Sequence, residues 1–314
     1  MTSIKEINQA ILNRRIPHGA FKNAYERSKE LFEIVELGLP GSGIMVYGSS
    51  GVGKTTLTKL VVEYGEKKYG ADSVIRTQLS SGATVKGLLS DLLFAYGDPL
   101  FKSGSQKQLE ARLANTIKER GTRIIIIDEL QHLIPGGNIS NRLADNILNT
   151  FKILDDTNVS FLLTGMEDIM LLWNLDEQIR SRFQTPYYLA RPTYPKDKRT
   201  WKGIIQKYIE TIEQHGMSID CQDFADRCYA ATQGAMRPLV LILTNAATFA
   251  FKDKQTVIST DHLRQAAEVQ IDKNDGMPNA FDVDLERVQK FSRDHSTNLR
   301  LAPTTRGLGE IFAT

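Results

Sequence analysis

Cysteine is nearly absent from this chain, since only Cys221 and Cys228 occur among its 314 residues. The two lie seven positions apart in a stretch with helical spacing, which places both on one face of a predicted helix. The alternative interpretations are that the two thiols form a disulfide or bind a metal ion together. We instead expect two reduced cysteines in an apolar core.

Long apolar runs and a strong net charge are also missing. No run approaches the about 18 apolar residues of a membrane-spanning helix, and the N-terminal MTSIKEINQAILNRR lacks the apolar segment of a signal peptide. The sequence therefore predicts a cytoplasmic protein without membrane contact. The formal net charge is only +2, so any binding to a polyanion must rest on a local basic patch.

What the sequence does contain, between residues 41 and 194, is an alternation of short apolar runs with helical stretches. This pattern is typical of a parallel sheet with helices on both faces, and the four consecutive isoleucines fit its buried centre. The predicted strands are Ile44–Tyr47, Val74–Gln78, Ile124–Ile127, Ser160–Thr164 and Pro186–Ala190, and the predicted helices are Thr55–Lys68, Val85–Tyr96, Gln106–Arg120 and Asn141–Asp155.

The two ends of the chain have other patterns. Residues 1–40 are polar and helical, with a break at Pro17–Gly19, and residues 195–271 show four helical stretches and no strand pattern. Either Ser259 or Thr260 is a suitable N-cap for the last of these helices. Residues 272–314 predict an extended or disordered tail. We therefore expect an N-terminal helical partner-binding segment, an α/β nucleotide-binding domain, a small all-helical lid domain and a tail.

The clearest motif is GSSGVGKT at Gly48–Thr55, which matches G-x-x-x-x-G-K-[ST] between a predicted strand and a predicted helix. Glycines let backbone N–H groups converge on phosphates at a helix N-terminus. Lys54 is expected to reach the β- and γ-phosphates of ATP, and the Thr55 hydroxyl to ligate Mg²⁺. The predicted nucleotide-binding residues are Gly48, Ser49, Ser50, Gly51, Val52, Gly53, Lys54, Thr55 and Thr56.

A second motif, RIIIIDE, ends the isoleucine strand in two carboxylates. Acidic residues follow many strands, but beside a P-loop they indicate a metal site and a catalytic base. Asp128 is expected to hold Mg²⁺ through water, and Glu129 to polarise the attacking water.

Two further polar residues are candidates for the same site. Thr164 ends the next predicted strand, so its hydroxyl should lie at the same sheet edge as Asp128, unless it is an ordinary turn residue. Arg237, in GAMRPL, opens a helix of the lid and could sense the γ-phosphate, unless it is a surface arginine. A third stretch, LDEQIRSRF at Leu175–Phe183, reads equally as a solvated helix end or as a source of catalytic arginines.

The order of these motifs resembles that of the AAA+ ATPases: P-loop, DE strand, polar residue, arginine pair, then a helical lid with GxxR. Within them, RIPHGAF, IIIIDELQHL and FLLTGMEDI…LDEQIRSRF resemble the transposition regulators of the TniB and TnsC type. Replication initiators and insertion-sequence helper ATPases share parts of these motifs. The resemblance implies an ATPase that assembles on double-stranded DNA as a ring or helical filament, hexameric per turn, with hydrolysis controlling disassembly.

The resemblance also implies a catalytic arginine donated by a neighbouring subunit. Arg182 matches the position of this arginine finger better than Arg180, although the choice between them stays open. A guanidinium there would stabilise charge on the γ-phosphoryl oxygens.

DNA contacts are implied on the helical insert between the second and third strands. Lys86 and Ser105 match positions that touch the DNA backbone in TnsC-type proteins, and Lys102 and Lys107 lie nearby. Lysines on a solvated helix face are the alternative interpretation. The implied partners are a TniQ-type targeting protein and a DDE transposase. Two other functions remain open: a signalling or secretion-associated ATPase without DNA binding, and a replication initiator or helicase loader.

Overall fold

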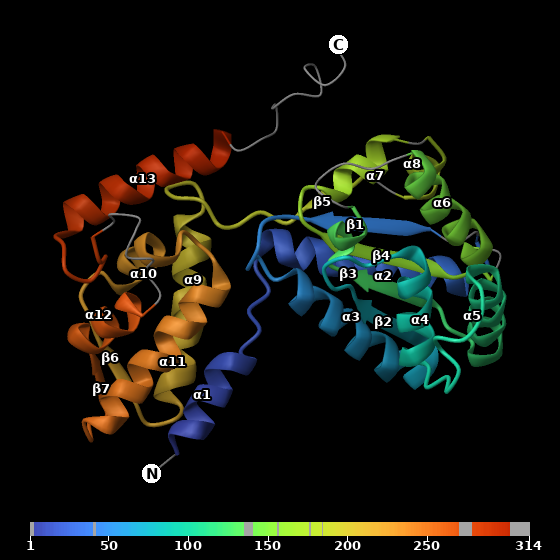
Figure 1. Ribbon diagram of the computed structural model, residues 1–314. Helices are drawn as coiled ribbons and strands as arrows, with labels where there is room; N and C mark the ends of the chain where they lie inside the picture. Colours follow the sequence, from blue (N-terminus) through green and yellow to red (C-terminus); the bar gives the residue numbers. More distant parts are fainter. Residues whose placement is uncertain are drawn as a thin grey trace. The chain divides into compact units, whose positions relative to one another are not determined.

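A computed structural model of the chain describes residues 3–39, 42–134, 141–155, 157–175, 177–183, 185–269 and 278–301 (Figure 1). The chain divides into two compact units, the sheet unit Gly19–Ala190 and a second unit formed by Met1–His18 and Arg191–Thr314. The expected N-terminal segment 1–40 is therefore shared between the units. Helix α1 (Ile4–Asn13) belongs to the second unit, whereas α2 (Gly19–Glu36) belongs to the sheet unit.

The sheet unit contains a five-stranded parallel sheet of order β2-β3-β4-β1-β5. All five predicted strands are present, and their ends differ from the prediction by at most two residues. The strands are β1 (Gly43–Tyr47), β2 (Val74–Gln78), β3 (Ile124–Asp128), β4 (Ser160–Gly165) and β5 (Tyr187–Tyr188).

The four isoleucines of β3 show why this sheet needs cover on both faces. Ile124 and Ile126 pack into one apolar cluster, and Ile125 and Ile127 pack into the other. Successive side chains of a strand point to opposite faces, so an unbroken apolar run requires two apolar layers. Each fully buried isoleucine contributes about 1.5–3 kcal/mol relative to an exposed one.

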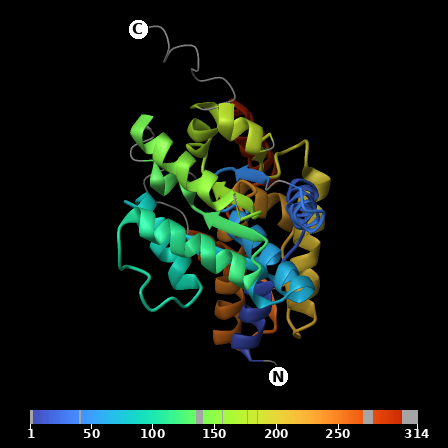
Figure 2. The ribbon, with the colours of Figure 1, turned by 90° about the vertical axis from the view of Figure 1, so that its right-hand side faces the viewer.

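Helices supply those two layers on opposite sides of the sheet (Figures 1 and 2). One layer consists of α2 and α3 (Lys54–Tyr69), whose apolar residues join the cluster of Ile124 and Ile126. The opposite layer consists of α4 (Val85–Ala95), α5 (Gln106–Arg120), α6 (Asn141–Asp155), α7 (Ile169–Leu175) and α8 (Glu177–Arg182). Two short 3₁₀ turns, η1 (Ala71–Ser73) and η2 (Leu130–Leu133), complete the unit.

The second unit is mostly helical, as expected, but it also contains two short parallel strands. Its helices are α1, α9 (Lys198–Glu213), α10 (Phe224–Thr232), α11 (Met236–Lys252), α12 (Thr260–Glu268) and α13 (Leu285–Leu301). The prediction of an all-helical lid missed β6 (Ser218–Asp220) and β7 (Val257–Ser259). Three residues are too few to show the alternation by which strands are recognised.

Two expectations for this unit need correction. The predicted tail contains α13, because Phe281 and Val288 find buried positions and Arg227 donates to the carbonyls of Ala280 and Val283, both at 2.8 Å. Residues 302–314 lie outside the described part of the chain. Cys221 is not on the same helix as Cys228, because α10 begins only at Phe224. Both thiols are free, and burial raises the pKa of Cys228 well above its ordinary value.

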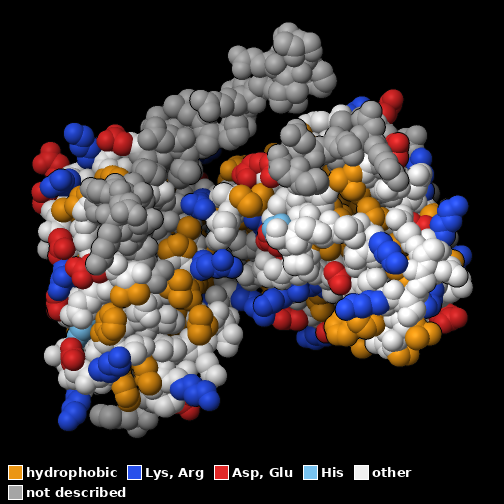
Figure 3. Space-filling view, viewed as in Figure 1, with side chains coloured by type: hydrophobic (Ala, Val, Ile, Leu, Met, Phe, Trp, Pro, Cys, Tyr) orange, Lys and Arg blue, Asp and Glu red, His pale blue; other side chains and the backbone are white. Residues whose placement is uncertain are grey.

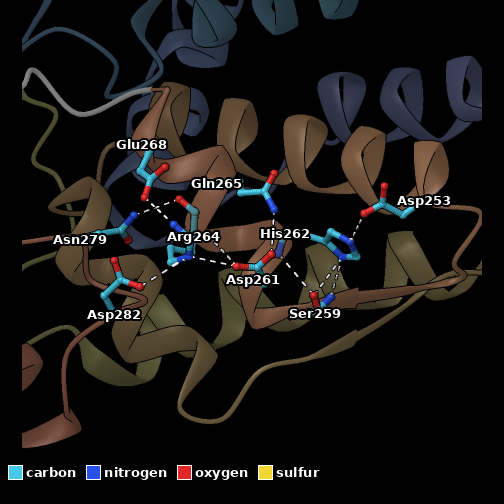
Figure 4. Close-up of polar contacts among 9 residues, drawn as sticks. All are labelled: Asp253, Ser259, Asp261, His262, Arg264, Gln265, Glu268, Asn279 and Asp282. Atoms are coloured by element: carbon cyan, nitrogen blue, oxygen red, sulfur yellow. Dashed lines mark hydrogen bonds and ion pairs between the residues drawn. The ribbon is translucent and has the colours of Figure 1, made fainter.

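Helix α12 begins as the sequence suggested. The Ser259 hydroxyl accepts a hydrogen bond from His262 N–H at 3.3 Å, and Ser259 N–H donates to His262 Nδ1 at 3.1 Å (Figure 4). Since Nδ1 accepts this bond, the ring proton lies on Nε2 and points to Asp253 Oδ2, 3.1 Å away. Ser259, rather than Thr260, is therefore the N-cap. None of the described helices is both long enough and apolar enough to cross a membrane.

Candidate active site at the carboxyl edge of the sheet

The P-loop connects β1 to α3, and two of its glycines hold backbone angles that other residues avoid. Gly51 has φ 79° and Gly53 has φ 104°, in the left-handed region that favours glycine. Gly48 is required for a different reason, because a Cβ there would lie 2.5 Å from the carbonyl oxygen of Leu189. The glycines therefore set the shape of this loop.

Lys54, the first residue of α3, folds back over this loop. Its Nζ donates to the carbonyls of Gly48 at 2.8 Å and Ser49 at 3.0 Å, and the residue is buried. A buried ammonium group needs such acceptors. Thr55 and Thr56 follow on the first turn of α3 and are half-buried, and Val52 packs into the core beneath the loop.

Asp128 ends β3 at the same edge of the sheet, with no exposed surface. Its Oδ1 accepts hydrogen bonds from the Thr164 hydroxyl and, at 3.1 Å, from Glu129 N–H. Its Oδ2 pairs with Arg76 Nη2 at 2.8 Å. Thr164 therefore lies where the sequence suggested, because β3 and β4 are parallel neighbours that end at one edge.

Arg76 is a residue of this site that the sequence analysis missed. It lies in β2, its side chain is 22% exposed, and its Nε also donates to Thr58 Oγ1 in α3 at 2.9 Å. Arg76 thereby links the carboxylate that ends β3 to the helix that follows the P-loop. The available signal was one cation inside an otherwise uncharged strand, VIRTQ.

Glu129 follows Asp128 in a left-handed conformation, with φ 59°. Its carboxylate oxygen Oε2 accepts a hydrogen bond from Gln131 Nε2 at 2.5 Å, and Gln131 Oε1 accepts one from Met166 N–H at 3.0 Å. Gln131 was also missed, because an amide two residues beyond the carboxylate pair has no distinctive pattern. The two carboxylates of the DE motif therefore have different partners.

The two arginines of LDEQIRSRF have different surroundings. Arg180 is exposed, and its Nη1 donates to the carbonyl of Asn174 at 2.9 Å, near the end of α7. Arg182 is half-buried and ends α8. The next residue, Phe183, is buried against β1, where a Cβ at Gly43 would lie 2.1 Å from its ring. Phe183 thus anchors Arg182 to the sheet unit, and Arg180 has a local structural role.

Arg237 is the second residue of α11 and is exposed. It belongs to the second unit, whereas the P-loop belongs to the sheet unit. Its expected role at the γ-phosphate stays a prediction.

Three of the four residues expected to contact DNA lie at the connection between α4 and α5 or in the first turn of α5, and Lys86 lies in the first turn of α4. Lys86, Lys102, Ser105 and Lys107 are all exposed. Ser105 already has a structural role as the N-cap of α5, since its hydroxyl accepts from Gln108 N–H and its own N–H donates to Gln108 Oε1 at 2.7 Å. Figure 3 shows hydrophobic side chains beside basic ones where α4 ends, and the exposed Phe94 and Leu100 belong to this stretch.

The comparisons with known proteins agree with this geometry. Residues 40–172 match a family model described as "AAA domain". Similar solved structures include the ORC1 protein of Aeropyrum pernix in complex with DNA, with TM-score 0.63, 17% identity, and 92% of this chain and 87% of that chain covered. The ORC2 protein of the same organism, in ADPNP–ADP complexes, has TM-score 0.63 and 17% identity, covering 83% and 71%. Cdc6p from Pyrobaculum aerophilum has TM-score 0.61 and 14% identity, covering 86% and 74%. The sheet unit with its following helices therefore has the P-loop AAA+ fold.

Proposed function

We propose that this chain binds ATP at the P-loop and hydrolyses it to ADP and phosphate. The observation that carries the proposal is the convergence of Lys54, Asp128, Glu129 and Thr164 at one edge of an AAA+ sheet. A P-loop beside two strand-end carboxylates is the arrangement by which such folds transfer the γ-phosphoryl group.

In this proposal Glu129 is the general base. It accepts a proton from the attacking water, the water oxygen bonds to the γ-phosphorus, and the bond to the β–γ bridging oxygen of ADP breaks. Lys54 and the N–H groups of the P-loop stabilise the phosphate charge. Thr164 donates a hydrogen bond to Asp128, and in this proposal it would also help to orient the water or the γ-phosphate.

Magnesium fits the oxygen ligands that this edge offers. Mg²⁺ prefers carboxylate, hydroxyl and phosphate oxygens, and the Thr55 hydroxyl and the Asp128 carboxylate are of this kind. When bound, the ion would neutralise phosphate charge. Asp128 is held in place by Arg76, Thr164 and the backbone of Glu129.

Hydrolysis further depends, we propose, on a second copy of this chain. Arg182 is the preferred finger, because it ends α8 directly before Phe183, whose ring packs against Gly43 of β1. Arg237 would sense the γ-phosphate from the lid. An arginine contributed by a neighbour would make turnover conditional on assembly.

The nucleotide-dependent assembly would act on duplex DNA. One structurally similar protein, ORC1 of Aeropyrum pernix, was solved in complex with DNA. Lys102, Ser105 and Lys107 lie exposed at the α4–α5 connection, and Lys86 lies exposed in the first turn of α4. Such side chains are suited to phosphate contacts that carry no sequence information. Within this proposal, the TniB/TnsC resemblance favours a regulator of transposition. The structural similarity to ORC and Cdc6 proteins favours a replication initiator as the second candidate.

For the transposition role, the partners would be a TniQ-type targeting protein and a DDE transposase. The segment 1–40 was expected to bind a partner, but Ile7 and Ile11 of α1 are already buried within this chain. The remaining exposed face of α1 and the residues beyond α13 are the better candidates for docking. If strand transfer by a purified transposase requires this chain, the result would support the role in transposition. If this chain instead loads a replicative helicase onto DNA, the result would favour the role of a replication initiator.

The ATPase proposal is tested with two substitutions. Lys54→Ala should abolish binding of a fluorescent ATP analogue, whereas Glu129→Gln should keep binding and lower turnover by about 10²–10⁴, the usual contribution of a positioned base. Glu119→Gln, at an exposed position of α5, is the matched control and should behave as wild type. Normal turnover by Glu129→Gln would show that Glu129 is not the base.

DNA binding needs its own experiment. Electron microscopy with duplex DNA and a non-hydrolysable ATP analogue should show rings or filaments along the DNA. Lys86→Ala should weaken DNA binding and reduce its salt dependence, while ATP affinity is unchanged. Lys118→Ala, at the other end of α5, is the control. Isolated monomers beside unchanged DNA would favour the ATPase without DNA binding.

A further inference from the structure

We infer that Gln131 is a positioning residue that holds the Glu129 carboxylate and connects it to the P-loop. The inference rests on the proposed ATPase function. It depends on a chain of three hydrogen bonds, from Glu129 through Gln131 and one peptide group to Gly48.

The first two bonds use both ends of one amide. Gln131 Nε2 donates to Glu129 Oε2 at 2.5 Å, and Gln131 Oε1 accepts from Met166 N–H at 3.0 Å. The opposite orientation of the amide would face its oxygen to a carboxylate and its NH₂ to an N–H group. The contacts therefore permit only one orientation of this side chain.

The third bond belongs to the same peptide group as the second. The carbonyl of Gly165 accepts from Gly48 N–H, the first residue of the P-loop, at 3.2 Å. That carbonyl and the N–H of Met166 are the two ends of one planar peptide unit. A rotation of this unit would therefore disturb the P-loop contact and the Gln131 contact together.

The surroundings leave Gln131 little freedom to move. Its exposure is only 9%, and a Cβ added at Gly165 would lie 2.7 Å from Gln131 Oε1 and 2.4 Å from Ile169 Cγ2. A buried amide that loses its partners leaves polar groups unsatisfied. The side chain is thus held from both sides, and it holds Glu129 in turn.

This arrangement gives Gln131 a defined role in turnover. Glu129 must stay where a water between it and the γ-phosphate can lose its proton, and the Gln131 amide fixes one of its two carboxylate oxygens, Oε2. Gln131 itself touches neither the nucleotide-binding loop nor a reacting atom in these contacts. Its loss should therefore lower kcat with little effect on ATP binding.

The principal test is Gln131→Leu in the full-length chain, assayed with ATP, Mg²⁺ and duplex DNA. We expect kcat to fall by about 10- to 100-fold, a part of what a positioned base contributes, while the Kd for a fluorescent ATP analogue changes by less than about threefold. The matched control is Gln106→Leu in α5. Gln106 Nε2 also donates to a glutamate, Glu110, at 2.9 Å, but away from the site, so kcat should stay at the wild-type value.

Two more variants distinguish a role of Gln131 in positioning Glu129 from a role in the stability of the protein. Gln131→Glu keeps the volume and an acceptor for Met166 N–H but removes the donor to Glu129, so it should lower kcat even if Gln131→Leu folds poorly. In a Glu129→Gln background, Gln131→Leu should cause no further loss in single-turnover hydrolysis, because residues that act as a unit are not additive. An equal further loss would overturn the inference.

The outcomes also distinguish the inference from the function on which it rests. Turnover in the wild type that depends on Glu129, together with a normal kcat in both Gln131 variants, overturns the inference alone. A wild-type protein without Glu129-dependent turnover overturns the proposed function and the inference with it.

Discussion

Two clusters of polar side chains among the described residues differ in burial and in sequence separation. The strand-edge cluster consists of Arg76, Asp128, Glu129, Gln131 and Thr164. The α12 cluster consists of Asp253, Ser259, Asp261, His262, Arg264, Gln265, Glu268, Asn279 and Asp282 (Figure 4). Asp128 is fully buried, whereas Asp261 has a side chain that is 61% exposed.

The ion pairs of the two clusters differ in the sequence separation of their partners and in how much they stabilise the protein. Arg264 pairs with Asp261 at 2.7 Å and with Glu268 at 2.6 Å, three and four positions away on the same helix. Such exposed pairs stabilise a helix only slightly. Arg76 instead reaches Asp128 across 52 positions. Its partner carries a buried charge, and that charge is costly unless it is paired.

Breaking the buried pair should have the largest effect on stability. Arg76→Met leaves Asp128 buried without its cation, at a cost of about 3 kcal/mol. We expect the lower end of the usual range, because the Thr164 hydroxyl and Glu129 N–H still bond the carboxylate. Chemical denaturation followed by circular dichroism measures the change.

A matched ion pair in the same unit serves as the control for that substitution. Arg120 pairs with Asp72 at 3.2 Å, and both side chains are about half exposed. Arg120→Met should therefore cost no more than about 0.5 kcal/mol. Equal losses in the two variants would mean that burial does not govern the strength of these pairs.

The same contrast shows how far the sequence could predict the structure. The isoleucine strand, the strand–loop–helix context of the P-loop and a cap at Ser259 or Thr260 are local patterns, and the structure has each of them, with Ser259 as the cap. The Arg76 contact depends on the register of two strands. Arg76 lies opposite Ile126, so Asp128 is two residues further along the same face. Nothing local to VIRTQ encodes that pairing, and only the fold brings the two residues together.

The residues of the candidate active site also fall into those that local motifs predict and those that only the fold brings together. The P-loop residues and the DE pair follow from motifs, because the chemistry requires those residue types in that order. Gln131 was not predicted because its contacts are with Met166 and Gly165, which lie at the end of β4 and are distant in the sequence. Helix α13 was not predicted because its few apolar residues gain their burial from distant parts of the chain, including Ala230 and Ala231 of α10.

A smaller effect is expected at the cap of α12. Ser259→Ala removes the acceptor for His262 N–H, which should cost about 1 kcal/mol and speed amide hydrogen exchange in the first turn of this helix. Thr260→Ala is the control, because the Thr260 hydroxyl contacts the carbonyl of Asp220 at 3.4 Å and the Cys221 thiol, and accepts no N–H group of α12 in these contacts. Faster exchange in the Thr260 variant than in the Ser259 variant would contradict the assignment of the cap.

The smallest effect should come from Asp261, and it should depend on pH. Hydrogen bonds from Arg264, followed by Gln265, hold the pKa of Asp261 below its ordinary value. A carboxylate with a lowered folded-state pKa stabilises the protein above its unfolded-state pKa, and this contribution is lost as the pH falls through the folded-state pKa. Asp261→Asn should therefore lower the denaturation midpoint slightly at pH 6, and the difference from wild type should begin to shrink near about pH 4 and vanish only at lower pH, below the folded-state pKa. Because the group is exposed and screened by water, the loss at pH 6 should be smaller than that of Ser259→Ala. A larger loss would mean that exposed ion pairs, and not the cap, hold α12 in place.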